Sequence, residues 1–211
     1  MHTTQLPLVT GHNPPKGLSA DIAAVQSVIE KAIRSGNDVI VCPRSWAGMV
    51  AGCALVGYGS KERKARGGNG GVVRWRELDR SQSRAALDVV VTQRLLDDEF
   101  ALLHDNAEDV FYNDLPPDRR THWFKEVSRT HSLHPFTAKA TGEAWNQIPT
   151  YYLICEEDLV ILNTLQEAMT SMIRDKSGEL RNYRFKSSHS PLLSHVDETV
   201  AWIRKVAGEH V

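Results

Sequence analysis

The sequence has no long apolar run and no excess of charge of one sign. Its apolar runs, such as residues 39–42 and 151–155, are only four or five residues long. A helix that crosses a bilayer needs about 20 apolar residues, so we predict no membrane partner. The 25 basic and 26 acidic residues leave a net charge of −1. This balance gives no indication of a nucleic-acid partner or a membrane surface.

Cysteine is scarce as well. Cys42, Cys53 and Cys155 are the three cysteines, and they form no C-x-x-C pair. Each lies in an apolar stretch, which predicts reduced, buried thiols in an intracellular protein. Residues 1–5 show no basic segment followed by an apolar core, so no secretory signal is predicted. These observations favour a cytoplasmic location.

Patterns that bind phosphate, nucleic acid or metal are also missing. The glycines of residues 60–71 match neither G-x-x-x-x-G-K-[ST] nor G-x-G-x-x-G, so no phosphate cradle and no cofactor are predicted. The basic residues of this stretch stand beside Glu62 without aromatic residues, which favours a solvated polar loop over a nucleic-acid site. His131 and His134 are three residues apart, but Pro135 interrupts the helix that would align them, so no metal site is predicted.

An alternation of strands and helices runs through the chain. Short apolar-rich stretches predict buried strands at residues 39–42, 150–155 and 183–185. Apolar residues at three- and four-residue steps predict a helix over residues 18–33. Further helices are predicted at residues 46–58, 162–173 and 196–206. We therefore expect one α/β domain over residues 1–211, with a mostly parallel sheet covered by helices on both faces.

Three polar residues follow the three predicted strands. Ser45 comes after the first strand, Asp158 after the second and His189 after the third. Because the carboxyl ends of parallel strands share one edge of a sheet, we expect these side chains to meet there. A serine hydroxyl becomes nucleophilic when an imidazole accepts its proton, and the imidazole needs a carboxylate to fix its tautomer. The chain order Ser, Asp, His is that of a fold with a nucleophile elbow.

Four short motifs surround these positions: PRSWAG at 43–48, FYNDLPP at 111–117, YLICEED at 152–158 and SHSPLL at 188–193. Together they resemble the α/β-hydrolase superfamily, and within it the small esterase-like branch of fungi and plants. The first motif is similar to the nucleophile elbow, and the second to the start of a helical cap. The third is similar to the segment that ends at the triad acid, and the fourth to the loop of the catalytic histidine.

The resemblance implies an esterase-like serine hydrolase that acts on a small, fairly apolar ester. It makes Ser45 the nucleophile, His189 the general base, and Asp158 the acid that orients the imidazole. It makes the backbone N–H of Trp46 a donor to the oxyanion. A small-molecule substrate is the partner that this reading implies.

The resemblance also implies a small helical cap, inserted at residues 97–145. Within this segment, Trp123 and Phe124 either pack the cap or contact the substrate. Arg44 stands where the family usually has histidine. It is either exposed to solvent or a contact for an anionic group of the substrate.

Two features depart from the family pattern. Pro43 and Ala47 replace the glycines that flank the nucleophile in a strained turn. The family's early strand, with a His-Gly segment that completes the oxyanion hole, has no counterpart in the 38 residues that precede Val39. Its absence would expose residues 39–42 as an apolar sheet edge, so we predict a homo-oligomer formed through this edge, or marginal stability.

Several alternatives stay open on the sequence alone. Ser45 also suits a turn or a helix N-cap, and Asp158 also suits an N-cap, with Glu156 and Glu157 as competing acids. The departures from the family pattern favour a catalytically impaired relative that binds a ligand or a partner. A non-hydrolytic lyase or cyclase on the same scaffold is a further alternative.

Overall fold

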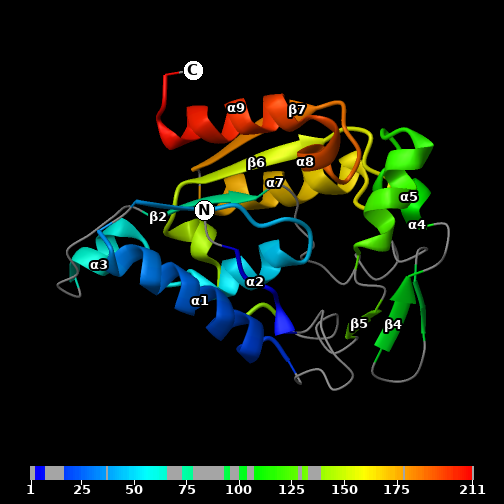
Figure 1. The fold of residues 1–211 in the computed structure, drawn as a ribbon. Coiled ribbons are helices and arrows are strands. Elements are labelled where there is room, and N and C mark those ends of the chain that lie inside the picture. Colours follow the sequence, from blue (N-terminus) through cyan, green and yellow to red (C-terminus); the bar gives the residue numbers. More distant parts are fainter. Residues whose placement is uncertain are drawn as a thin grey trace.

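The computed structural model describes most of the chain and places it in an α/β arrangement (Figure 1). The described residues are 3–7, 17–36, 38–65, 73–77, 93–95, 100–103, 107–127, 130–132, 139–177 and 179–210. His134, Pro135 and residues 66–71 of the glycine-rich stretch lie outside them. Within the described ranges, no helix has the length and apolar character needed to cross a membrane.

Four parallel strands form the central sheet, in the order β1-β2-β6-β7. They are β1 (Val39–Val41), β2 (Val73–Glu77), β6 (Thr150–Cys155) and β7 (Leu180–Phe185). The predicted parallel sheet is therefore confirmed. Because all four strands run in the same direction, their carboxyl ends lie at one edge of the sheet.

Helices cover both faces of this sheet (Figure 1). On one face lie α1 (Ser19–Arg34), α2 (Ala47–Ala54) and α7 (Asn163–Ser177). On the other face lies α9 (Val196–Ala207), which follows the short helix α8 (Pro191–Ser194). This two-sided arrangement is the one that the alternation of strands and helices predicts.

The side chains of β6 alternate between two apolar cores. Tyr152 and Ile154 are fully buried and pack in a cluster with Leu55 and Ile173 from the helices of one face. Leu153 points the other way and packs with Trp202 of α9. Because β6 meets apolar side chains on both faces, its sequence is continuously apolar rather than alternating.

Between β2 and β6 the chain forms a smaller unit of mixed structure. Three antiparallel strands pair in the order β3-β4-β5. The elements of this unit are β3 (Gln93–Leu95), β4 (Phe100–Leu103), α4 (Ala107–Phe111), α5 (Pro117–Lys125) and β5 (Thr130–Ser132). The short helix η3 (Ala144–Asn146), just before β6, packs in the core of the main sheet. Figure 1 shows α4 and α5 beyond the carboxyl end of β6.

Three expectations need correction. Residues 97–145 contain the expected helices, but β4 and β5 are strands, because segments of three or four residues are too short for a pattern to separate strand from helix. The first part of the expected polar loop is a helix, α3 (Ser60–Ala65), built from Lys, Glu and Arg, which favour helices. Cys53 and Cys155 are buried thiols as predicted, whereas Cys42 is exposed just beyond the end of β1.

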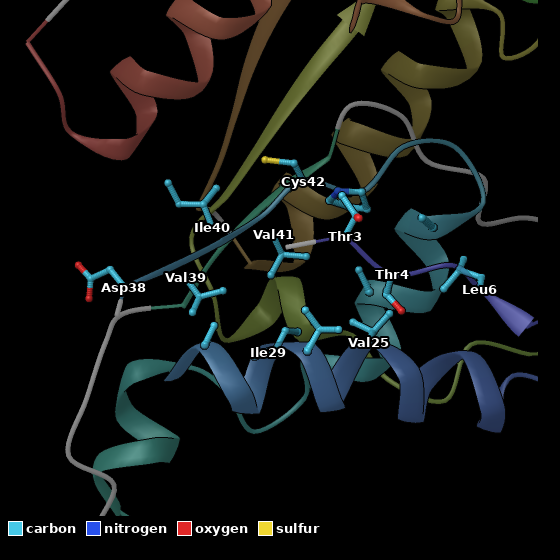
Figure 2. A pocket seen from close by; sticks show the side chains of 15 residues that line it. Thr3, Thr4, Leu6, Val25, Ile29, Asp38, Val39, Ile40, Val41 and Cys42 are labelled. Carbon is cyan, nitrogen blue, oxygen red and sulfur yellow. The ribbon is translucent and has the colours of Figure 1, made fainter. Parts of the chain in front are cut away.

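β1 lies at the edge of the described parallel sheet, with β2 on one side only. A groove of about 620 Å³ runs along it (Figure 2). Figure 2 shows Val39 and Val41 pointing toward α1, and Ile40 pointing away from it. The groove is lined mainly by apolar side chains of α1, β1 and α2, together with Thr3, Thr4 and Leu6. Among the described strands, β1 is therefore an edge strand, as the sequence predicts for residues 39–42.

Candidate functional site

Ser45 occupies a sharp turn between β1 and α2. Its φ angle is 53°, and within the described part of the chain it is the one residue other than glycine with a positive φ. A side chain in this left-handed region costs about 1–3 kcal/mol, so the turn is held in place by its surroundings. Pro43 is buried two residues earlier. Because the strand-to-helix turn forms with Pro43 in this position, the turn accommodates the fixed φ of proline.

The residue after Ser45 begins the helix that follows. Trp46 is the N-cap of α2, and Gly48 N–H donates to the Ser45 carbonyl at 2.9 Å. The positive end of the helix dipole therefore lies beside the Ser45 side chain. Seven of the eight residues of α2 are buried, and its small side chains allow close packing under the sheet.

Asp158 is held by the loop that follows β6. Its Oδ1 accepts hydrogen bonds from the backbone N–H groups of Val160 at 2.7 Å and Ile161 at 3.0 Å. Gln166 of α7 fixes both ends of this loop. Its Oε1 accepts from the Cys155 N–H at 3.0 Å, and its Nε2 donates to the Ile161 carbonyl at 2.7 Å. Asp158 is therefore part of an Asx turn and not the N-cap of α7.

The second oxygen of Asp158 faces His189. Asp158 Oδ2 and His189 Nδ1 are 2.9 Å apart, and both side chains are 0% exposed. The ring of Phe111 packs edge-on against the imidazole, with 5.3 Å between ring centroids. In the neutral imidazole that donates from Nδ1 to the carboxylate, Nε2 is the proton acceptor. This is the state that a general base requires.

Arg44 joins the turn of Ser45 to the loop of His189. Its Nε donates to the His189 carbonyl at 3.2 Å, and its guanidinium donates to Ser190 Oγ at 2.5 Å. The turn that contains Ser45, called the elbow below, and the loop that carries His189, called the base loop below, are therefore adjacent. Ser45 Oγ itself makes no hydrogen bond to a described residue. The structure thus brings Asp158 and His189 into contact and places Ser45 next to the loop that carries the imidazole.

The first turn after α4 packs onto both of these loops. Asn113 Nδ2 donates to the Glu157 carbonyl at 2.9 Å, and Asp114 Oδ2 accepts from the Ser188 N–H at 2.7 Å. Tyr112, the residue before Asn113, is buried in a cluster with Leu115 and Phe124. Burial raises the pKa of its phenol, although the positive charge of Arg44 partly offsets this effect. Tyr112 is consequently neutral at physiological pH.

The two aromatic residues proposed for substrate contact lie on α5. Phe124 is 6% exposed and packs in a cluster with Tyr112 and Leu115. Trp123 is half-buried and packs against the same cluster, as Leu193 does. Arg44 is also half-buried, and its side chain bonds to the loop of His189.

The sequence analysis missed the residues that hold the site in place. Gln166 carries no sequence signal, since a single glutamine on a helix gives no indication that it is buried. Asn113 and Asp114 belong to the FYNDLPP motif, which resembles the start of a cap. The motif marks these two residues but does not indicate their contacts with the loops of Asp158 and His189. Among the described residues, no group of three or more His, Cys, Asp or Glu side chains could hold a metal ion.

Sequence comparison gives relatives over nearly the whole chain. A family model described as alpha/beta hydrolase family matches residues 5–202. Alpha/beta hydrolase nvfD of Aspergillus novofumigatus (strain IBT 16806) is 27% identical over 223 residues, which cover 98% of this chain and 84% of that protein.

Solved structures share the fold at low sequence identity. Polyneuridine aldehyde esterase is 13% identical, with a TM-score of 0.65 over 91% of this chain and 80% of that one. Pyrethroid hydrolase PytH is 15% identical, with a TM-score of 0.59 over 92% and 80%. Tomato methylketone synthase I, complexed with 2-tridecanone, is 10% identical, with a TM-score of 0.65 over 92% and 79%. At these identities the likeness extends to the fold alone.

Proposed function

Because the chain belongs to the alpha/beta hydrolase family, we propose that it is a serine hydrolase that cleaves a small, fairly apolar carboxylic ester. The observation that carries the proposal is the buried contact of His189 Nδ1 with Asp158 Oδ2 at 2.9 Å, on a loop that Arg44 ties to the strained turn of Ser45. A strained serine between a strand and a helix, on a turn joined to the loop of an oriented imidazole, supports nucleophilic catalysis.

In the first half of the reaction, Ser45 Oγ attacks the carbonyl carbon of the ester. Its proton passes to His189 Nε2, and the carbonyl oxygen becomes an oxyanion. As the tetrahedral intermediate collapses, His189 returns the proton to the departing alcohol, and an acyl group remains on Ser45. The contact between Ser45 Oγ and His189 Nε2 has to form when substrate binds, as is common for catalytic hydrogen bonds that are long in free enzymes.

In the second half, a water molecule takes the place of the alcohol. His189 accepts a proton from the water, the hydroxide attacks the acyl carbon, and Ser45 leaves with that proton restored. Asp158 stays ionised throughout, because its role is to hold Nδ1–H and to stabilise the imidazolium. The hydrogen bonds from Val160 and Ile161 to its other oxygen hold the carboxylate in place.

The oxyanion needs donors that are already in place. The Trp46 backbone N–H, at the start of α2, is the proposed donor, and the helix dipole adds to its effect. A second donor is not assigned among the described residues. Since one oxyanion donor is worth about 10²–10³ in rate, we expect a modest turnover.

Apolar side chains of α4, α5 and α8 near His189 support the proposed class of substrate. Phe111 touches His189, and Trp123 and Leu193 are half-buried in the same cluster. As part of a cap at residues 97–145, α4 and α5 would present Phe111 and Trp123 to the substrate. The similarity to proteins described as an esterase and a pyrethroid hydrolase agrees with an ester.

Hydrolysis of nitrophenyl esters tests the proposal. The chain should release nitrophenol from acetate, butyrate and octanoate esters above the buffer rate, with KM falling as the acyl group becomes more apolar. A folded chain that is inert toward all three, and that a fluorophosphonate does not label, would contradict hydrolysis.

A second candidate is a catalytically impaired protein that binds an apolar ligand. The absence of a hydrogen bond from Ser45 Oγ to a described residue favours it. A lyase or cyclase reaction is a variant of this reading, because one protein of this fold is described as a methylketone synthase. Ester turnover that depends on Ser45 decides for hydrolysis. Ligand binding without turnover decides against it.

Arg44 offers a test of how the elbow and the base loop are joined. Replacement by lysine keeps the charge but cannot reproduce the two-pronged geometry toward the His189 carbonyl and Ser190 Oγ. We expect Arg44→Lys to lower kcat by about tenfold to 100-fold with little change in KM, because a displacement of about 1 Å costs that much. Steady-state kinetics on a neutral ester measures this.

The control for Arg44 is Arg119→Ala, which removes an arginine bond to the Leu193 carbonyl on the exposed surface. This variant should keep the wild-type kcat. If Arg44→Lys instead raised KM for anionic esters only, Arg44 would be a substrate contact and not a tether.

We also propose that two copies of the chain associate through β1, the edge strand described above. Ile40→Lys places a charge on this edge, which prevents strand pairing. We expect the wild-type chain to sediment as a dimer or larger species and Ile40→Lys as a 23.6 kDa monomer. Val200→Lys, at an exposed position of α9, is the control that should not change the mass. A wild-type monomer at micromolar concentration would contradict the proposal.

A cytoplasmic location remains a prediction from the cysteine content.

A further inference from the structure

One turn of the chain, at Asn113 and Asp114, contacts both the loop of Asp158 and the loop of His189. Asn113 donates to the carbonyl of Glu157, the residue before Asp158. Asp114 accepts from the N–H of Ser188, the residue before His189. The two adjacent side chains therefore bridge the acid loop and the base loop at equivalent positions.

The bond from Asp114 is the stronger of the two. Its length of 2.7 Å and its carboxylate acceptor make it a charge-assisted hydrogen bond, which is about twice as strong as a neutral one. The Asp114 side chain is 10% exposed, and its Oδ2 also lies 3.9 Å from His195 Nε2, at the start of α9. Asp114 Oδ1 is buried without a hydrogen bond to a described residue, so the contacts at Oδ2 are the ones that position the carboxylate.

The turn is itself held rigidly by Arg120 of α5. The guanidinium donates to the carbonyl of Leu115 at 2.6 Å and to that of Asn113 at 2.9 Å. It also pairs with Asp109 of α4 at 2.8 Å. The positions of Asn113 and Asp114 are thus fixed by both helices of the proposed cap.

We infer that Asn113 and Asp114 are positioning residues, which align Asp158 with His189 and couple this alignment to the cap helices α4 and α5. Neither side chain touches the reacting atoms, and both act through the backbone of the triad loops. The inference rests on the proposed hydrolytic function for its effect on rate. Its effect on the hydrogen bond between His189 and Asp158 does not depend on hydrolysis.

Asp114→Ala and Asp114→Asn test this inference, with Asp118→Ala as control. Asp118 is an exposed aspartate in the first turn of α5, and no described contact depends on its side chain. The first readout is the low-field proton resonance of His189 Nδ1–H, which reports the bond to Asp158 with or without activity. The second readout is the separation of kcat from KM for ester hydrolysis.

We expect Asp114→Ala to broaden or abolish the low-field resonance and to lower kcat by about 10²-fold, with KM nearly unchanged. Asp114→Asn should restore most of both, because an amide oxygen can still accept from the Ser188 N–H. A folded Asp114→Ala with an unchanged resonance would overturn the inference. If Asp114→Ala does not fold, Asn113→Ala decides, since a weakened resonance supports the inference and an unchanged one overturns it.

The same design separates the two proposals. If the wild-type chain shows the resonance but cleaves no ester, hydrolysis fails, while the positioning role is judged on the resonance alone. If the wild-type chain cleaves esters and the Asp114 variants match it in both readouts, the positioning role fails and hydrolysis stands.

Discussion

Replacement of Ser45 by alanine should reduce ester hydrolysis by about 10³-fold or more, with the protein remaining folded. The hydroxyl is the proposed nucleophile. Among the described residues, Ser45 is the one non-glycine residue with a positive φ, and Arg44 next to it bonds to the loop of His189. Loss of a nucleophile removes the covalent route as a whole, so the remaining rate comes from binding and the oxyanion donor alone.

Glycine at the same position gives a second, independent result. Ser45→Gly should be equally inactive but more stable by about 1 kcal/mol, because glycine adopts a φ of 53° without strain. Denaturant unfolding measures the difference. The control is Ser60→Ala, at an exposed position of α3, which should retain full activity. A Ser45→Ala variant that hydrolyses esters at the wild-type rate would remove Ser45 from the mechanism.

Asp158→Asn should lower kcat by about 10⁴-fold while KM stays close to the wild-type value. The asparagine amide can donate to His189 Nδ1, which shifts the ring proton to Nε2 and leaves no acceptor for the Ser45 proton. Its remaining oxygen can still accept from the N–H groups of Val160 and Ile161, so the loop keeps its shape. Steady-state kinetics measures the loss of kcat, and circular dichroism checks that the variant stays folded.

Glu157→Gln is the matched control for Asp158→Asn. Glu157 was a competing candidate for the triad acid, and its side chain is exposed to solvent. This variant should keep the wild-type kcat. If Glu157→Gln lost activity and Asp158→Asn did not, the acid would be assigned to the wrong residue, although Asp158 is the one in contact with His189.

The sequence is sufficient to predict the strands that are continuously apolar and the helices that have a regular apolar face. The strand at 150–155 is apolar at every position except the first, and both of its faces are buried. Its position next to β7 brings Asp158 and His189 together, as the rule for carboxyl ends of parallel strands predicts. Contact between residues 31 positions apart thus followed from local patterns and a rule of topology.

Other features depend on contacts that no local pattern encodes. The strands β3 and β4 have three and four residues, and their pairing with each other is a tertiary contact. Gln166 acts through its three bonds to Cys155 and Ile161, at the ends of the acid loop. Asp114 acts through a backbone N–H 74 residues away. The exposure of Cys42 is likewise set by where β1 ends.

Fluorophosphonate labelling of the wild-type chain tests the central claim most directly, because it reports an activated serine without a choice of substrate. Trypsin cleaves after Arg44 and Lys61, so Ser45 begins the peptide of residues 45–61. We predict that mass spectrometry finds one adduct, on Ser45 in this peptide, and that Ser45→Ala and Asp158→Asn abolish it. A folded chain that takes no label, or that carries the adduct on another residue, would contradict the account.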